Sequence, residues 1–203
     1  MKKDGIPLVS VVAICYNHEK FLEETLESIR LQTYKNLELI ILDDFSTDSS
    51  VKVIESWIND NNFNCNFIKN SENLGVVKSL NKAVKQCIGK YYSLTACDDI
   101  ILPKKIENQI NIFEKLDNKY AAIYSDAYII DDNGNYSYGT HIAKKQINHP
   151  PSVNIYEELI KHDNFIPANS LLFKASSIKE IGFFDESLSY EDYDMLLRLS
   201  RKY

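Results

Sequence analysis

The chain has 203 residues, of which 44% are hydrophobic and 26% charged, and it carries a formal net charge of −6. This length and balance predict one globular domain with a sizeable core. The acidic charge argues against a nucleic-acid-binding protein, since those proteins usually present a basic face. The sequence has neither a run of about 18 apolar residues nor a signal-peptide pattern, so we expect a cytoplasmic protein.

The four cysteines, Cys15, Cys65, Cys87 and Cys97, show no CxxC spacing. They also lack histidine partners at metal-ligand distances, which argues against a zinc site. We interpret them as small hydrophobic residues of a protein in a reducing compartment.

The first hundred residues alternate short apolar runs with helical patterns. Strands are predicted at residues 8–15, 37–42, 67–68 and 91–95. Apolar residues at helical spacing separate these runs, around residues 22–29, 51–58 and 77–88. A further helix is expected after Pro103, because proline suits the first turn of a helix. This alternation predicts an α/β fold with a mostly parallel sheet between helices, and a ligand at the carboxyl ends of the strands.

The second half of the chain is less regular. Strands are expected at residues 120–124, 127–130 and 169–174, and a turn at residues 132–135. Residues 137–153 are polar and lack periodicity, so we expect a mobile loop that acts as a lid over the ligand. A last helix is expected at residues 191–201, close to the end of the chain.

The strand expected at residues 91–95 runs into two carboxylates, Asp98 and Asp99. Hard oxygen ligands suit Mg²⁺ or Mn²⁺, and such sites often use one or two carboxylates while substrate phosphates complete the shell. A metal ion there would neutralise a diphosphate leaving group. The alternative is that Asp98 caps the helix near Pro103, or that both residues belong to a turn.

The strand expected at residues 37–42 also ends in acids, Asp43 and Asp44. A carboxylate only accepts hydrogen bonds, so Asp43 is suited to receive one from the N–H of a nucleotide base. An acidic turn with a helix cap is the alternative.

A third acidic group opens the last predicted helix and contains Glu191, Asp192 and Asp194. A carboxylate in this position can point into a cleft as a general base. The alternative is an acidic first turn that interacts with the helix dipole.

The order of these motifs resembles that of the family 2 glycosyltransferases, whose fold is called GT-A. The resemblance begins with Pro7-Leu8-Val9-Ser10-Val11-Val12 and Tyr16-Asn17. It continues, in family order, through Leu26-Glu27-Ser28-Ile29 with Gln32-Thr33, Asp43-Asp44-Phe45-Ser46-Thr47-Asp48, Asn73-Leu74-Gly75 with Asn81, Asp98-Asp99, Ile181-Gly182-Phe183-Phe184-Asp185 and Glu191-Asp192-Tyr193-Asp194. Each motif is weak alone, but together they span about residues 7–198.

The resemblance implies an inverting enzyme that moves a sugar from a nucleotide-diphosphate donor, favoured to be a UDP-sugar, to a saccharide or lipid-linked acceptor with Mn²⁺ or Mg²⁺. It implies a single GT-A domain, with a nucleotide-binding half at residues 1–100 and an acceptor-binding half at residues 101–203 that is cut short at its C-terminus. The family's usual context implies cell-surface polysaccharide or glycolipid synthesis, with peripheral association at the inner face of the membrane.

Family roles are carried over by position. Ile14, Tyr16 and Asp43 would hold the base of the donor. Asp98 would approach the ribose, and Asp99 would ligate the metal ion.

Asp192 would be the general base that deprotonates the acceptor hydroxyl. Four tyrosines of the second half are expected at the surface, where they would stack on acceptor sugars or be ordinary partly buried aromatics: Tyr136, Tyr138, Tyr156 and Tyr190.

The sequence departs from the family pattern in two places. The family often has an arginine just before the position of Asn81, where this chain has Leu80, so Lys78 is the nearest cation for the donor. The chain also ends soon after the helix of the expected base. Three histidines are candidates for additional metal ligands or are ordinary surface or core residues: His141, His149 and His162.

Other nucleotide-binding classes fit less well. A dehydrogenase or a sugar-nucleotide pyrophosphorylase needs a glycine-rich turn early in the chain, and no glycine lies between residues 6 and 74. A second alternative is a catalytically inactive nucleotide-sugar-binding module of a larger polysaccharide-assembly protein. The presence of both Asp99 and Asp192 favours the enzyme.

Overall fold

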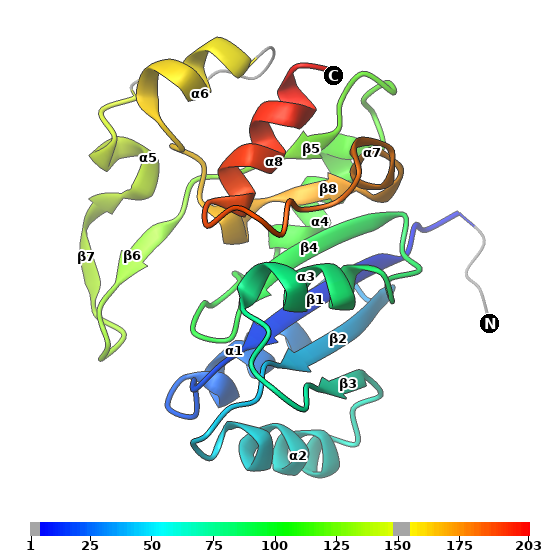
Figure 1. Cartoon of the computed structure of the whole chain (residues 1–203), viewed down its shortest axis with the longest axis vertical. Helices are drawn as coiled ribbons and strands as arrows, with labels where there is room; N and C mark the ends of the chain where they lie inside the picture. The colour runs from blue at the N-terminus through cyan, green and yellow to red at the C-terminus, as the bar shows by residue number, and fades with distance from the viewer. Residues whose placement is uncertain (1–4, 148–154) are drawn as a thin grey trace.

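The structure, a computed structural model, describes residues 5–147 and 155–203. Its elements follow in the order β1 (Val9–Cys15), α1 (Leu22–Arg30), β2 (Leu37–Asp43), α2 (Ser50–Asn61), β3 (Asn66–Lys69), α3 (Val76–Val84), β4 (Tyr91–Ala96), α4 (Lys105–Phe113), β5 (Ala122–Ile123), β6 (Tyr128–Ile130), β7 (Tyr136–Thr140), α5 (His141–Lys144), α6 (Tyr156–His162), the 3₁₀ helix η1 (Ala168–Ser170), β8 (Leu172–Lys174), α7 (Ala175–Ile181) and α8 (Glu191–Ser200) (Figure 1).

The main sheet has six strands in the order β3-β2-β1-β4-β8-β5. The first four strands are parallel, and β8 and β5 continue the sheet in antiparallel pairing. This arrangement confirms the predicted α/β fold with a mostly parallel sheet. A second sheet consists of the antiparallel hairpin β6–β7.

Each face of the main sheet is covered by its own hydrophobic cluster. Alternate residues of β1 divide between them, because successive side chains of a strand point to opposite faces: Val11 belongs to one cluster and Val12 to the other. Helices α1, α2 and α4 pack on the Val11 face. Helices α3, α7 and α8 pack on the Val12 face and lie in front of the sheet in Figure 1. Because the central strands are buried on both faces, their sequences are nearly continuous apolar runs.

The second half differs from the sequence-based expectation. Residues 137–147 do not form a loop, because β7 and helix α5 occupy most of them. The remainder of the expected lid, residues 148–154, lies outside the described residues. Helices α6 and α7 were not predicted from the sequence, and the strand expected at residues 169–174 is shortened to β8 by the turn of η1. No helix in the described part of the chain is long and apolar enough to cross a membrane.

Candidate functional site

The parallel strands end at one level, which brings the predicted site residues to one edge of the sheet. Cys15 at the end of β1 lies opposite Asp43 at the end of β2, and Ile14 lies opposite Ala96 at the end of β4. Tyr16 follows β1 directly. The sequence-based expectation that these strand ends share an edge is therefore confirmed, and we call this edge the strand-end site.

Asp43 is buried at the base of the strand-end site and shapes the loop that follows it. Its carboxylate accepts hydrogen bonds from the backbone N–H of Ser46, at 2.9 Å, and from the Ser46 hydroxyl. The side chain of Asn17 reaches the same loop from β1 and accepts a hydrogen bond of 2.8 Å from the N–H of Thr47. Asn17 has a φ of 56°, a left-handed conformation that asparagine tolerates better than most residues.

Asp44 fixes the next loop of the site. Its buried carboxylate accepts hydrogen bonds from the N–H groups of Leu74 and Gly75, both at 2.9 Å, and from the amide of Asn70 at 2.7 Å. Burial opposes ionisation of Asp44, but these hydrogen bonds outweigh it and lower its pKa. The start of α3 is thereby held against the end of β2.

The other residues expected to hold the donor have different surroundings. Tyr16 is 44% exposed and accessible at the end of β1. Ile14 is half-buried and packs against the cluster under α3, while its carbonyl accepts a hydrogen bond of 3.0 Å from the N–H of Cys97. Lys78 is exposed on α3. Of these three residues, Tyr16 therefore offers the most open side chain at the strand-end site.

Asp98 and Asp99 follow β4 and differ in burial. Asp98 is exposed, and its carboxylate lies 3.7 Å from Nε2 of His18. Asp99 is half-buried, and its pKa is raised to about 6, chiefly by burial and then by the charge of Asp98. The side chain of Asn169 interacts with Asp99 and opposes this shift of the pKa. Asp98 does not cap α4, because that helix begins only at Lys105.

Lys105 is a cation close to Asp99. Its ammonium group donates a hydrogen bond of 3.0 Å to the hydroxyl of Ser93, and burial lowers its pKa to about 7. A lysine held in this way supplies less positive charge at neutral pH than an exposed one. The carboxylates of Asp98 and Asp99 are thus only partly compensated by the protein.

The residues at this position fit a divalent cation that also binds a substrate. In residues 5–147 and 155–203, no group of three or more His, Cys, Asp or Glu side chains is placed to hold a metal ion. Two adjacent carboxylates suffice for Mg²⁺ or Mn²⁺ when waters and phosphate oxygens fill the remaining positions. Asp98 and Asp99 meet this requirement, with the incomplete charge compensation just described.

Asp192 lies in the first turn of α8, and a short segment of chain links it to Asp99. Asn164 donates a hydrogen bond of 2.8 Å from its side-chain amide to the Asp192 carboxylate. Five residues further along, the side chain of Asn169 interacts with Asp99. Five residues span at most about 17 Å even when fully extended, so residues 164–169 limit how far apart the two carboxylates can lie.

The acidic neighbours of Asp192 have other surroundings. Asp194 forms an ion pair of 2.6 Å with Arg198, which also donates hydrogen bonds to the carbonyls of Ile181 and Phe183. Asp194 therefore braces the loop between α7 and α8. Glu191 is half-buried, and its pKa is raised by burial and by the charge of Asp192.

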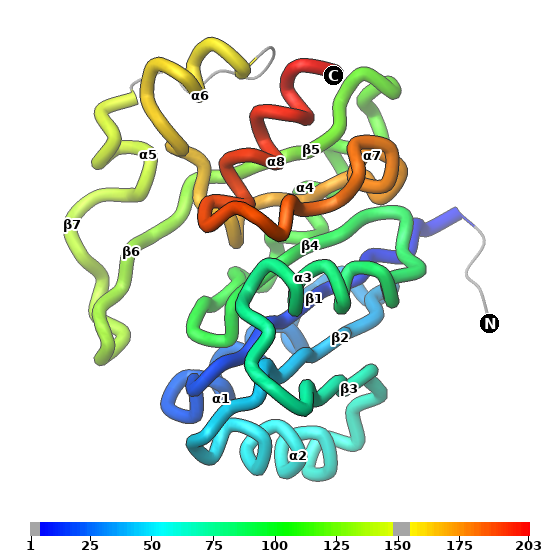
Figure 2. The backbone as a smooth tube through the Cα atoms, in the orientation of Figure 1, coloured from blue at the N-terminus to red at the C-terminus, as the bar shows by residue number. Residues whose placement is uncertain are grey.

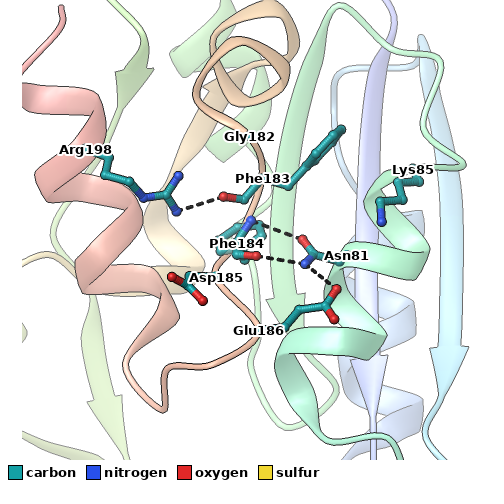
Figure 3. A pocket seen from close by; sticks show the side chains of 8 residues that line it. All are labelled: Asn81, Lys85, Gly182, Phe183, Phe184, Asp185, Glu186 and Arg198. Atoms are coloured by element: carbon teal, nitrogen blue, oxygen red, sulfur yellow. Dashed lines mark hydrogen bonds between the residues drawn. The ribbon is translucent and has the colours of Figure 1, made fainter.

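A hollow of about 410 Å³ beside α3 and α8 shares no lining residue with the strand-end site. Figure 3 shows Asn81 and Arg198 approaching the loop of Phe183 and Phe184 from opposite sides. Asn81 donates to the carbonyl of Phe184 at 2.9 Å and accepts from its N–H at 3.1 Å. Asn81 therefore has a structural role, because it holds the loop of Phe183 and Phe184 against α3.

Of the three histidines singled out in the sequence, the two in the described residues have surroundings away from the strand-end site. His162 faces Glu158 within α6, at 3.4 Å, and His141 begins α5. His149 lies outside the described residues. The histidine that does reach the site is His18, which sequence reasoning missed although it follows Tyr16-Asn17 at the end of β1.

Comparison with known proteins agrees with this arrangement. The sequence profile of Glycosyl transferase family 2 matches residues 10–182. The chain belongs to this family. A family 2 relative, the uncharacterized glycosyltransferase RT0329 of Rickettsia typhi, is 35% identical over 96% of this chain and 59% of its own length. The chain thus spans about six tenths of that relative.

A characterised relative is the Escherichia coli UDP-Glc:alpha-D-GlcNAc-diphosphoundecaprenol beta-1,3-glucosyltransferase WfaP. It is 32% identical over 96% of this family 2 chain and 71% of its own length.

Solved structures confirm the GT-A fold. The structure of S. aureus TarS 1-349 superposes with a TM-score of 0.72 and 21% identity, over 96% of this chain and 55% of that one. The mannosyltransferase PcManGT from Pyrobaculum calidifontis, in complex with GDP-Man and Mn²⁺, superposes with a TM-score of 0.69 and 17% identity, over 95% of this chain and 52% of that one.

Proposed function

We propose that this family 2 chain is the catalytic part of an inverting glycosyltransferase that moves a sugar from a UDP-sugar to a saccharide or lipid-linked acceptor. The observation that carries the proposal is the joining of Asp192 to the strand-end site through residues 164–169. A single displacement needs carboxylates that hold the donor and its metal ion, and a separate carboxylate nearby that takes the proton of the acceptor.

The donor half of the proposal rests on the strand ends. Asp43, Tyr16 and Ile14, which lie at the ends of the neighbouring strands β1 and β2, are the residues proposed to bind the base. Asp98 is exposed on the side where a ribose would lie. Lys78, exposed on α3, is the candidate cation for the donor. TarS is known in complex with UDP and with UDP-GlcNAc, which supports a uridine nucleotide as the first ligand to test.

A divalent cation held by Asp99, with Asp98 beside it, would neutralise the charge that develops on the diphosphate leaving group. The Mn²⁺ bound with GDP-Man in PcManGT supports Mn²⁺ as the first metal to test.

The reaction itself is a single in-line displacement. The acceptor oxygen attacks the anomeric carbon, the bond from that carbon to the diphosphate oxygen breaks, and the nucleoside diphosphate leaves with the electron pair. Asp192 takes the proton from the attacking hydroxyl as the new bond forms. Because attack occurs opposite the leaving group, the configuration at the anomeric carbon is inverted.

The acceptor is proposed from the relative that has a defined substrate. WfaP acts on a GlcNAc-diphosphoundecaprenol lipid, so a lipid-linked saccharide is the acceptor class to test, with this chain at the inner face of the membrane during cell-surface polysaccharide or glycolipid synthesis.

The decisive experiment combines calorimetry with a transfer assay. UDP should bind in the presence of Mn²⁺, and UDP-glucose should be consumed when a GlcNAc-diphosphoryl lipid is added. UDP binding without any transfer or donor hydrolysis would instead identify a nucleotide-sugar-binding module. Absence of UDP and GDP binding would reject the proposal.

A further inference from the structure

The hairpin β6–β7 carries an aromatic surface that faces solvent. Tyr128 pairs with Thr140 and Ile130 pairs with Tyr136 across the hairpin. The register shifts between Tyr128 and Ile130, but the rings of Tyr128 and Tyr136 contact each other, and Tyr138 lies two residues from Tyr136, so the three tyrosines share one face. The tyrosines are 62%, 71% and 100% exposed at positions 128, 136 and 138, respectively. We call this surface the tyrosine face.

The opposite face of the hairpin is the covered one. Ile129 and Ser137 are half-buried there, and the ammonium group of Lys144 on α5 donates a hydrogen bond of 2.6 Å to the Ser137 hydroxyl. A ribbon packed on a protein usually turns its apolar face inward and its polar face to water. The hairpin does the reverse, which indicates that the tyrosine face serves a ligand rather than the core.

The hairpin is anchored next to the residues that hold Asp99. The N–H of Ser125 donates to the hydroxyl of Ser170, at 3.3 Å, and the side chain of the adjacent Asn169 interacts with Asp99. Tyr128 is three residues beyond Ser125, a distance that extended chain covers in about 10 Å.

Asp126 secures the base of the hairpin. Its carboxylate accepts hydrogen bonds from the hydroxyl of Thr140 and from the N–H of Ile142, at 2.9 Å. In Figure 2 the hairpin stands apart from the main sheet, on the side toward which β1, β2 and β4 run. The hairpin therefore lies on the side of the strand-end site, where an acceptor would extend away from the donor.

The chemistry of the tyrosine face favours a neutral sugar. A hollow of about 620 Å³ at β7 takes in residues from both faces of the hairpin, and all of those described are uncharged: Tyr128, Tyr136, Ser137, Tyr138, Gly139 and Thr140. This volume falls in the range of about 300–1,000 Å³ that is usual for ligand sites. Tyrosine combines an apolar ring with a hydroxyl, which matches a sugar ring that has a C–H face and a hydroxyl rim.

The arrangement of the rings leaves stacking surfaces free. The rings of Tyr128 and Tyr136 meet edge to face, with centroids 5.4 Å apart and an interplanar angle of 77°. Such a pair fixes both rings and leaves ring surface open to a ligand. Tyr138 is fully exposed at the next outward-facing position of β7.

We propose that the tyrosine face binds neutral saccharide units of the acceptor by stacking, a role that rests on the proposed transferase function. It acts as a positioning surface for the part of the acceptor that lies away from the reacting hydroxyl. The free energy of stacking on the tyrosines holds the acceptor at the strand-end site, and it does so without adding charge near the diphosphate.

The test measures direct binding of neutral disaccharides to the whole chain by saturation-transfer NMR. The three disaccharides are N,N′-diacetylchitobiose, cellobiose and maltose. Tyr136→Ala and Tyr138→Ala should each weaken binding of the preferred disaccharide about twofold to tenfold, the loss expected for one aromatic contact. Tyr138→Phe, which keeps the ring, should retain most of the affinity. Tyr156→Ala is the matched control, because that ring contacts Arg201 rather than the hairpin.

Several results would overturn the proposal. One is wild-type protein that binds none of the three disaccharides, and another is alanine variants that bind them normally. A third is a Tyr138→Ala variant that binds sugar normally but loses self-association or binding to phosphatidylglycerol vesicles, because the face would then serve a second copy of the chain or a membrane. UDP affinity measured in parallel keeps the two proposals distinct. A chain that binds disaccharides through the tyrosine face but binds neither UDP nor GDP retains this site and rejects the proposed donor function.

Discussion

The side-chain amide of Asn164 donates a hydrogen bond to the Asp192 carboxylate over 2.8 Å. The other carboxylate oxygen of Asp192 accepts a bond of 2.7 Å from the N–H of Tyr193. Together these bonds fix the orientation of the carboxylate at the start of α8. Each oxygen retains a lone pair, so the group can still accept a proton from an acceptor hydroxyl.

The first prediction concerns Asp192 as the base. Asp192→Asn keeps the size and position of the side chain but removes its ability to take a proton. A positioned base contributes about 10²–10⁴-fold in rate, so transfer should fall at least about 100-fold while UDP affinity stays nearly unchanged. Rate measurements at saturating donor, with calorimetry of UDP, check both parts.

Two neighbouring acids serve as controls for Asp192. Glu191→Gln should have a mild effect, and Asp194→Asn should lower thermal stability more than the chemical rate, because it breaks the ion pair with Arg198. Loss of transfer in Glu191→Gln with normal transfer in Asp192→Asn would mean that the base is assigned one position too late.

The second prediction concerns the metal. UDP should bind more tightly with Mn²⁺ than with a chelator, and Asp99→Asn should lose this difference because a charged ligand is gone. Asp98→Asn should retain more of the metal dependence, consistent with a role toward the ribose. Calorimetry with and without Mn²⁺ measures the effect, and equal UDP affinity in metal and chelator for wild-type protein contradicts it.

The third prediction concerns recognition of the base. Asp43→Ala should weaken UDP binding, since a hydrogen bond to a charged group contributes about 1.5–3 kcal/mol. Asp43 also holds the Ser46 loop, so Ser46→Ala is the control that removes the hydroxyl bond but keeps the carboxylate and its bond to the backbone N–H of residue 46. If both variants lose UDP affinity equally, the effect comes from the loop and not from the base.

The fourth prediction concerns pH and the buried Asp44. Its pKa is lower in the folded protein than the ordinary value of 3.8. Its ionisation therefore stabilises the fold fully above the unfolded pKa, and this contribution disappears as pH falls through the folded pKa. Replacing Asp44 with Asn should cost about 1.5–3 kcal/mol at neutral pH, because the bonds to Leu74 and Gly75 lose their charge.

Denaturant unfolding of wild type and Asp44→Asn between pH 3 and pH 7 checks this prediction. The difference in free energy of unfolding between the two should be constant above about pH 5 and shrink below about pH 4, the region of an ordinary carboxyl pKa. A difference that grows on acidification would show that the sign is wrong.

The first half of the fold is predictable from sequence because its strands are long and buried on both faces. β1 and β2 each have seven residues, and their apolar runs dominate the pattern. The strand expected at residues 120–124 exists only as the two residues of β5, because its length is set by its pairing to β8, which sequence periodicity does not report.

The candidate site shows the same division. Asp43, Asp98 and Asp99 follow strands and could be placed at one edge from the order of elements alone. Asn164 and Asn169 sit in a segment whose contacts depend on how the second half packs against the first, so no local pattern marks them. The tyrosine pattern of β7 was read as a loop because its aromatic face points away from the core.

The position of β8 has a consequence for synthesis of the chain. Strand β4 pairs on one side with β1, but its other side is covered only when Leu172, Phe173 and Lys174 pair with Ser93, Tyr92 and Tyr91. A ribosome makes these partners about 80 residues later, at roughly 5–20 residues per second. For several seconds the nascent sheet presents an open apolar border, and any fragment that stops before residue 172 keeps that border permanently. Expression of residues 1–100 alone should therefore give aggregates, whereas the chain through residue 203 can close its own sheet.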